Sequence, residues 1–336
     1  TEETFTPLDL TPALWMDAAD TTTVTIASSA VSEWKDKSGN NRHLTQTTGG
    51  NRPTYISAAQ NGLSVVRFDG SNDYFDGTGL GTPGSITFFA VVNRHTAVDQ
   101  GTLFASDGAW SSTKLHLTNL SGLTNRMSLN GGGTVNGSNP KTLNSWSIDT
   151  FHRGDVTNWG STGTVFHNGS TDGTASLGAN TLLSLSAFNI GNWDDGSTKQ
   201  RHLDGDIAEL IIYPANISDH DRQRVEVYLA MKWGLQEIMP SPVPSPSDAS
   251  KNPYVSSIGG NSVTTSVPLV DNGGADANVT VFYGTVDAGL SSATSGGTWS
   301  PTALGTSLAL WFDAKDLNAA GTADSTSNGN ITDWAD

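Results

Sequence analysis

Three short clusters of acidic residues are the first candidates for chemistry in this sequence of 336 residues. They are Asp17 with Asp20, Asp69 with Asn72 and Asp73, and Asp194 with Asp195. Calcium takes six to eight hard oxygen ligands, which carboxylates, amides and turn carbonyls supply. The sequence therefore predicts a calcium site at Asp69, Asn72 and Asp73, or at Asp194 and Asp195. In the alternative interpretation, Asp69 and Asp73 only close a hairpin.

Tryptophans in predicted loops are the second candidates. Trp110, Trp159 and Trp193 lie in segments rich in Gly, Asn or Asp. An exposed indole stacks on the C–H face of a sugar ring while neighbouring polar groups bind its hydroxyls, so these three residues are predicted glycan ligands. In the alternative interpretation, each indole only covers an end of the core. Tryptophans at strand or helix positions are assigned to the core: Trp15, Trp34 and Trp233.

Catalytic carboxylates are the third candidates. Hydrolysis of a glycosidic bond normally requires two carboxyl groups roughly 5–9 Å apart. Glu209 lies within a predicted strand and has no second acid two or five residues farther along. Asp206 should point to the opposite face, because side chains alternate along a strand. We therefore predict no catalytic residue and no enzyme, although a lyase using Tyr, His or Arg would leave no local signature.

The amino-acid composition argues against several classes of binding partner and of chemical site. The chain has 33 acidic and 17 basic residues, a formal net charge of −16, and no cysteine. Nucleic acid and anionic lipid are not expected partners of such a chain. The sequence also lacks an apolar run of about 18 residues, so membrane insertion is not expected. Disulfides, thiol nucleophiles and cysteine-ligated metals are excluded.

The elements that would position these residues are mostly strands. Short apolar or alternating runs bounded by Gly, Asn, Asp or Ser predict strands at residues 13–17, 64–68, 85–93, 102–105, 114–117, 126–129, 146–152, 165–167, 188–192 and 206–213. One helix should begin after Ser218 and end at Gly234, with Val225, Leu229 and Trp233 on its apolar side. The pattern predicts an all-β sandwich or barrel with one short helix.

Short segments near the start of the sequence recur near its end. Residues 4–7 recur at 298–301, residues 13–20 at 309–316, and residues 31–36 at 331–336. We expect the chain to be a window of just over one period from a tandem array.

Five segments resemble bacterial laminin-G-like jelly-roll domains of the concanavalin A-like lectin/glucanase superfamily. They are residues 14–20 (LWMDAAD), 31–40 (VSEWKDKSGN), 66–74 (VRFDGSNDY), 205–213 (GDIAELIIY) and 232–235 (KWGL). The resemblance implies a concanavalin A-like jelly roll, a location outside the cell or on its surface, and often a glycan or protein ligand near calcium. Residues 279–285 resemble half of a fibronectin-like module.

We predict four parts: a jelly roll (1–239), a Pro/Ser-rich linker (240–252), a small fibronectin/immunoglobulin-like β unit (253–299), and the start of a second jelly roll (300–336). Two functions are consistent with this organisation. One is adhesion through calcium-dependent binding of a glycan or another cell-surface ligand, and the other is a structural block in a fibre, sheath or stalk. We expect residues 301–336 to pair with neighbouring repeats or with another copy of the chain.

Overall fold

The computed structural model describes residues 5–97, 99–108, 113–120, 122–129, 133–154, 161–178 and 182–240, and the backbone of 254–259, 262–270 and 276–284. The chain divides into two units, Thr1–Pro240 and Ser241–Asp336. The predicted linker lies outside the described residues except for residue 240. The predicted start of a second jelly roll (300–336) lies entirely outside them.

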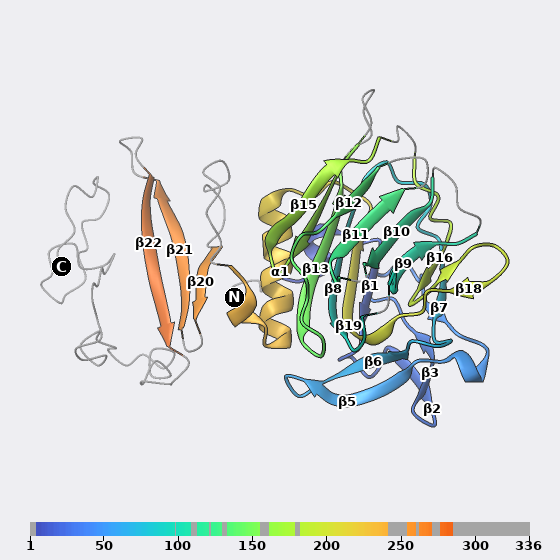
Figure 1. Cartoon of the computed structure of the whole chain (residues 1–336). Helices are drawn as coiled ribbons and strands as arrows, with labels where there is room; N and C mark the ends of the chain where they lie inside the picture. The colour runs from blue at the N-terminus through green and yellow to red at the C-terminus, as the bar shows by residue number, and fades with distance from the viewer. Residues whose placement is uncertain are drawn as a thin grey trace, which may run out of the picture. The chain divides into compact units, whose positions relative to one another are not determined.

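In the described part of the first unit, seventeen strands are connected by hydrogen bonds and form two layers (Figure 1). One layer contains β5 (Thr54–Gln60), β6 (Leu63–Asp69), β19 (Asp204–Tyr213), β1 (Leu14–Asp17), β8 (Ile86–Arg94), β13 (Trp146–Arg153), β14 (Thr162–His167) and β15 (Ser170–Ser176). The other contains β12 (Thr134–Asn136), β11 (Asn125–Leu129), β10 (Leu115–Asn119), β9 (Thr102–Ser106), β16 (Ala187–Ile190), β7 (Phe75–Thr78), β4 (Leu44–Thr45), β3 (Ala30–Trp34) and β2 (Val24–Ala27). The layers are joined where β3 pairs with β5.

The main core fills the space between these layers. Phe88 from the first layer contacts Phe104 from the second, with ring centroids 5.6 Å apart, and Phe104 stacks on Phe188 at 5.3 Å. All three rings are buried. Burial of such large apolar side chains is the dominant favourable term in folding, so this cluster holds the sandwich together.

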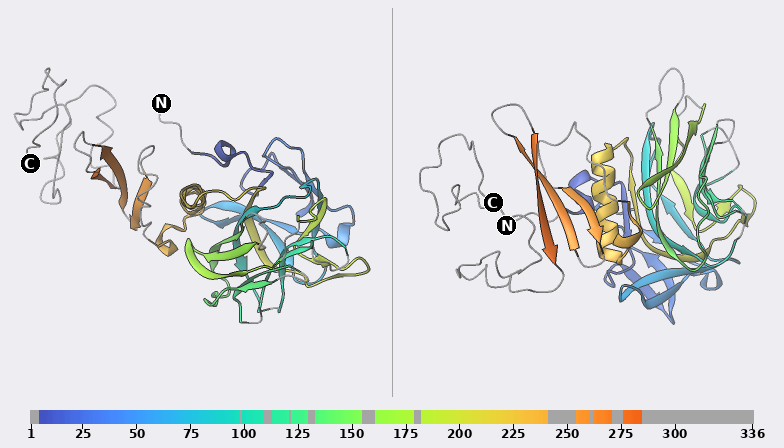
Figure 2. Two further views of the ribbon diagram at one scale, coloured as in Figure 1. Left: turned by 90° about the horizontal axis from the view of Figure 1, so that it is seen from above. Right: turned by 60° about the vertical axis from the view of Figure 1, so that its left-hand side comes forward.

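A second core lies on the outer face of the first layer, under the helix α1 (Asp219–Trp233) (Figure 2). Val225, Leu229 and Trp233 of α1 are fully buried there. The predicted caps are confirmed: the Ser218 side chain accepts the backbone N–H of Asp221, and Gly234 adopts the left-handed conformation with φ of 67°.

A bulge interrupts β19 at the point where its neighbour changes. Residues 204–207 of β19 pair with β6, and residues 209–212 pair with β1. On the other edge, the register with β8 shifts between Ile207 and Glu209. Ala208 is therefore an extra residue, and its carbonyl accepts the backbone N–H of Ala18 at 3.0 Å.

Three further short helical segments and two short strands complete the described first unit. They are η1 (Pro7–Leu10), η2 (Gly49–Asn51), η3 (Gln236–Ile238), β17 (Trp193–Asp194) and β18 (Lys199–Gln200). The second unit contains a three-stranded antiparallel sheet of β20 (Tyr254–Gly259), β21 (Ser262–Val270) and β22 (Asp276–Gly284) in its described residues.

The described part of the first unit is an all-β jelly-roll sandwich with one α-helix, as predicted. The core assignment of three tryptophans is also confirmed, because Trp34 and Trp233 are fully buried and Trp15 is 7% exposed. Across the described residues, no helix combines the length and apolar character needed to cross a membrane.

Candidate functional site

A pocket of about 320 Å³ lies at Trp193, one of the predicted ligand residues. It is lined by Gln100, His116, Thr118, Arg126, Ser128, Trp193 and Arg201. One indole, two guanidinium groups, an imidazole, an amide and two hydroxyls thus surround one space. A few convergent polar groups beside an aromatic side chain are typical of a small-ligand site.

The antiparallel pairing of β10 with β11 places four of these side chains on one face. His116 lies directly opposite Ser128, and Thr118 lies directly opposite Arg126. The residues that alternate with them along the two strands belong to the core between the layers: Leu115, Leu117, Met127 and Leu129. Because side chains alternate along a strand, the polar four point away from that core and line the pocket.

Two lining residues hold an uncommon backbone conformation. Gln100 has a φ of 62° and Arg201 a φ of 57°, in the left-handed region that residues other than glycine rarely adopt. Each is held by a backbone hydrogen bond: the Gln100 N–H donates to Asn119 at 2.8 Å, and the Arg201 carbonyl accepts from Thr102 at 3.0 Å. Such strain persists where the surroundings fix it, and it often occurs at ligand sites.

The pocket carries positive charge in a chain of net charge −16. None of its described lining residues is acidic. Burial, and then the charge of Arg126, lower the pKa of the Arg201 guanidinium. Burial, followed by the charges of Arg201, Arg126 and Lys114, lowers the pKa of His116 to about 3. His116 is therefore a neutral imidazole at physiological pH, and the two guanidinium groups supply the charge.

Trp193 supports Arg201. The guanidinium carbon of Arg201 lies 4.3 Å from the centroid of the indole, within the range of a cation–π contact. The His116 ring approaches the same indole edge-on, with centroids 4.9 Å apart. Trp193 thus orients a charged group as well as lining the pocket. The other two predicted ligand tryptophans, Trp110 and Trp159, lie outside the described residues.

The Asp69 turn satisfies much of its own hydrogen bonding. One oxygen of Asp69 accepts the backbone N–H groups of Ser71, Asn72 and Asp73, at 2.8, 3.1 and 3.4 Å. Asp73 accepts the backbone N–H of Asp69 at 3.1 Å. Burial and the neighbouring Asp69 charge raise the pKa of Asp73 to about 6. The turn therefore brings two carboxyl groups close together with unrelieved repulsion between them.

Asp194 and Asp195 have different interaction partners. Asp194 forms an ion pair with Lys199 at 2.9 Å, and the same ammonium group lies 2.9 Å from Asp76. Asp195 accepts the backbone N–H groups of Ser197 and Thr198, both at 2.8 Å. Over the described ranges, no three His, Asp or Glu side chains are grouped so that they could hold a metal ion. Calcium binding at either cluster remains a prediction.

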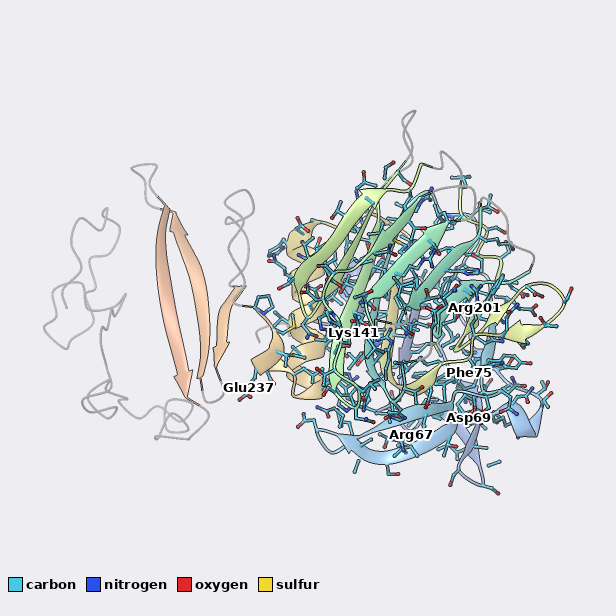
Figure 3. All side chains as sticks on the ribbon, in the orientation of Figure 1. Arg67, Asp69, Phe75, Lys141, Arg201 and Glu237 are labelled. Atoms are coloured by element: carbon cyan, nitrogen blue, oxygen red, sulfur yellow. The ribbon has the colours of Figure 1, made fainter. Side chains whose placement is uncertain are left out.

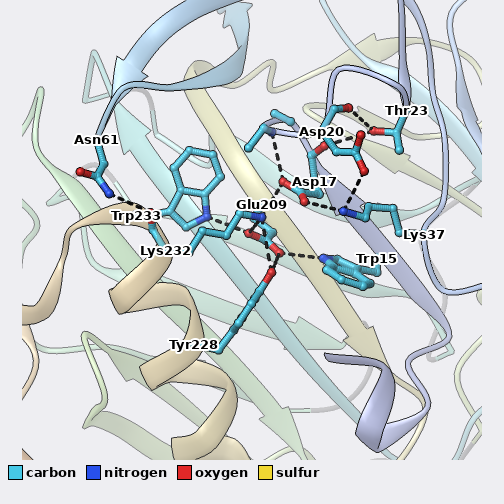
Figure 4. A network of polar contacts seen from close by, with 12 residues as sticks. Trp15, Asp17, Asp20, Thr23, Lys37, Asn61, Glu209, Tyr228, Lys232 and Trp233 are labelled. Carbon is cyan, nitrogen blue, oxygen red and sulfur yellow. Dashed lines mark hydrogen bonds and ion pairs between the residues drawn. The ribbon is translucent and has the colours of Figure 1, made fainter. Parts of the chain in front are cut away.

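Glu209 lies within the second core and is fully buried (Figure 4). Four donors surround its carboxylate: Trp15 Nε1 at 2.7 Å, Tyr228 Oη at 3.0 Å, Lys232 Nζ at 2.7 Å and Trp233 Nε1 at 2.8 Å. Burial, and then the nearby Asp17 charge, raise its pKa, while the Lys232 ammonium opposes that shift. This carboxylate joins α1 to the sheet.

The bulge in β19 corrects one prediction. Asp206 and Glu209 were expected on opposite faces, yet both lie on the helix side of the sheet. Asp206 is directly opposite Arg67 and binds it at 2.6 Å, whereas Glu209 is opposite Val91, a residue of the second core. The extra residue Ala208 breaks the alternation between them. Their partners are separate, so the two carboxyl groups form no shared site.

Sequence reasoning missed most of the pocket. His116, Thr118, Arg126 and Ser128 come from the successive strands β10 and β11, whose pairing brings them together, and Arg201 comes from a segment much farther along the chain. One signal was available: the alternation of polar and apolar residues at 115–118 and 126–129 marks a polar face on each strand. Arg201 (labelled in Figure 3) carried no comparable signal.

No family model matches the sequence, and no curated protein matches it significantly. Three solved structures show the range of similar folds. A Trypanosoma rangeli sialidase bound to the inhibitor DANA has 12% identity and a TM-score of 0.44, covering 64% of this chain and 32% of its own. The CBM40 of a Ruminococcus gnavus sialidase, bound to α2,3-sialyllactose, has 14% identity and a TM-score of 0.37, covering 44% and 84%.

Domain 4 of an extracellular GH43 arabinanase from Geobacillus stearothermophilus, in complex with arabinotriose, has 14% identity and a TM-score of 0.41, covering 55% of this chain and 89% of its own. The chain spans about a third of the sialidase. The similar structures include both enzymes and carbohydrate-binding modules, and at these identities the likeness concerns the fold alone.

Proposed function

We propose that the first unit is a non-catalytic carbohydrate-binding module of an extracellular or cell-surface protein, and that the pocket at Trp193 is its ligand site. The observation that supports this is the pocket itself, in which an indole, two guanidinium groups and two hydroxyls converge. Sugars present both C–H faces and hydroxyls, so a mixed aromatic and polar lining suits them.

Adhesion is the role that we assign to such a module. A single pocket of this size makes few contacts and gives modest affinity, but modules linked in one chain bind a polymeric ligand with much higher avidity. The repetition of residues 13–20 at 309–316 is consistent with more than one module.

The non-catalytic assignment is supported by Glu209. Its carboxylate is buried and surrounded by four hydrogen-bond donors, three of them from α1. An acid that cleaves a glycosidic bond must reach the glycosidic oxygen and act together with a second carboxyl group. The environment of Glu209 meets neither requirement.

The test is a glycan array probed with the intact chain, in calcium and in chelator, followed by calorimetry on the ligands that bind. Trp193→Ala should weaken binding at least tenfold, because it removes the surface that holds Arg201. Tyr74→Ala, which removes a half-buried aromatic ring that is not among the pocket's lining residues, should leave binding unchanged. Binding that survives Trp193→Ala, or an array without any bound glycan, would refute the proposal.

A structural block in a fibre is the second candidate. The observation in its favour is the sequence match between residues 310–313 and strand β1, because β1 pairs with β19 and the matching segment would pair in the same way within a neighbouring repeat or another copy. Self-association of the chain, measured as described in the Discussion, separates this function from glycan binding.

A further inference from the structure

We infer that the pocket at Trp193 selects acidic sugars, which carry a carboxylate or a sulfate ester. This inference rests on the proposed function and specifies its ligand class. The pocket presents two guanidinium groups, from Arg126 and Arg201, and no acidic side chain among its described lining residues. A planar guanidinium matches the two oxygens of a carboxylate or sulfate and binds them through parallel hydrogen bonds.

The donors in the pocket are incompletely used. Within the described residues, the buried Nε of Arg126 has no hydrogen-bond partner. A buried donor without a partner costs free energy, which an acceptor on the ligand would recover. A neutral hydroxyl can accept such a bond, but an anionic oxygen accepts it more strongly and also offsets the repulsion between the two arginines.

The arrangement also keeps the positive charge in place. Arg201 is held by its contact with the Trp193 indole and by its left-handed backbone, so it loses little freedom when a ligand binds. The attraction of Asp99 for Arg201 comes from outside the lining of the pocket. His116 remains neutral because burial lowers its pKa, so it adds no charge of its own to the pocket.

A second pocket differs from the site at Trp193 in its charge balance. That pocket, of about 430 Å³, is lined partly by Asp219 and Arg222. The two side chains form an ion pair at 3.3 Å, and Arg222 also binds Glu226. Its guanidinium is already neutralised, so this pocket offers no uncompensated charge to an anion.

The experiment compares matched ligands by calorimetry on the full chain. The probes are trigalacturonate, its carboxyl-reduced neutral counterpart galactotriose, and a sulfated galactose trisaccharide. Wild-type protein should bind at least one acidic probe ten times more tightly than galactotriose. Added salt should weaken that binding, because the contact is charge-assisted. The two acidic probes distinguish a carboxylate from a sulfate as the recognised group.

Arg126→Gln and Arg201→Gln should each reduce affinity for the acidic probe at least tenfold and change galactotriose binding little. Arg224→Gln, on α1 outside the pocket lining, is the matched control and should have no effect. Thermal melting verifies that each variant is folded. Neutral glycans bound as tightly as acidic ones, with binding lost in Trp193→Ala, would overturn the inference and leave the proposed function standing. Absence of any glycan binding would overturn both.

Discussion

The ammonium group of Lys232 on α1 lies 2.7 Å from Oε2 of Glu209 on β19, and both groups are largely enclosed. The same ammonium lies 2.6 Å from Asp17 on β1. One lysine therefore pairs with carboxylates from two neighbouring strands and fastens the helix to both. Removing one partner of such a buried pair leaves a charge without compensation, which typically costs about 3–5 kcal/mol.

Glu209→Gln should lower the free energy of unfolding by roughly 3 kcal/mol at pH 7. The substituted amide loses the charge that pairs with Lys232, and its nitrogen must face one of the donors that now surround the carboxylate. Urea unfolding followed by tryptophan fluorescence measures the loss. Glu33→Gln, a half-buried acid that accepts a bond only from Thr25 among the described contacts, is the control and should change stability by less than about 0.5 kcal/mol.

The same Glu209→Gln variant should leave the release of reducing or unsaturated sugar at background, as in the wild type. Clear release of sugar by the wild-type chain would refute the non-catalytic assignment.

Asp73→Asn should stabilise the protein at neutral pH. Burial and the Asp69 charge raise the pKa of Asp73 from 3.8 to about 6, so the folded state binds this proton more tightly than the unfolded chain. The resulting stabilisation is present below pH 3.8 and is lost as the pH rises through about 6. The variant should gain roughly 2 kcal/mol at pH 7 and should lack the fall in stability between pH 4 and 7 at this site. Parallel pH profiles of the two proteins would contradict the assignment.

Calcium should raise the melting temperature of the protein. A divalent ion held between Asp69 and Asp73 would relieve their repulsion, and a ligand that binds only the native state stabilises it by about 2.7 kcal/mol at a hundredfold excess over Kd. Millimolar calcium should shift the melting temperature by several degrees, and Asp73→Asn should abolish the shift if the ion binds at this turn. Identical melting in calcium, magnesium and chelator would eliminate a calcium site.

Residues 301–336 should make the chain self-associate. Leu310, Trp311 and Phe312 match β1 residues that are buried in the first unit, and β1 is hydrogen-bonded to β19. In light scattering, the full chain should form concentration-dependent oligomers that are absent from a chain ending at residue 300. The double substitution Leu310→Asp with Trp311→Asp should have the same effect as the truncation. Oligomers that persist in both proteins would show that another surface mediates association.

The predicted strands were those with a strong apolar pattern. A strand buried on both faces has a continuous apolar run, and a strand buried on one face alternates between apolar and polar residues. The segment predicted at residues 85–93 is β8, which is buried along almost its whole length. The helix was predictable for a local reason: Ser218 and Gly234 supply its caps. Weak strands were missed. β15 contains one apolar residue, Ala175, and its hydrogen bonds to β14 determine its structure.

The site was less predictable than the fold, for a physical reason. A pocket depends on which strands become neighbours, and nothing in residues 115–119 specifies that Thr118 will face Arg126. Tertiary hydrogen bonds hold Gln100 and Arg201 in the left-handed conformation. The local sequence therefore does not predict it. Trp193 was identifiable because its loop composition is local information.

The bulge at Ala208 also affects how β19 can change in length. Ile207 faces the main core, and Ala208 and Glu209 both face the helix. Deleting Ala208 would join Ile207 directly to Glu209 and restore regular alternation without turning any other side chain over. Deleting Leu210 or Ile211 would instead reverse one part of the strand against the other. Residue 208 is therefore a position in this strand where a deletion can be accepted during evolution, at the loss of one hydrogen bond to Ala18.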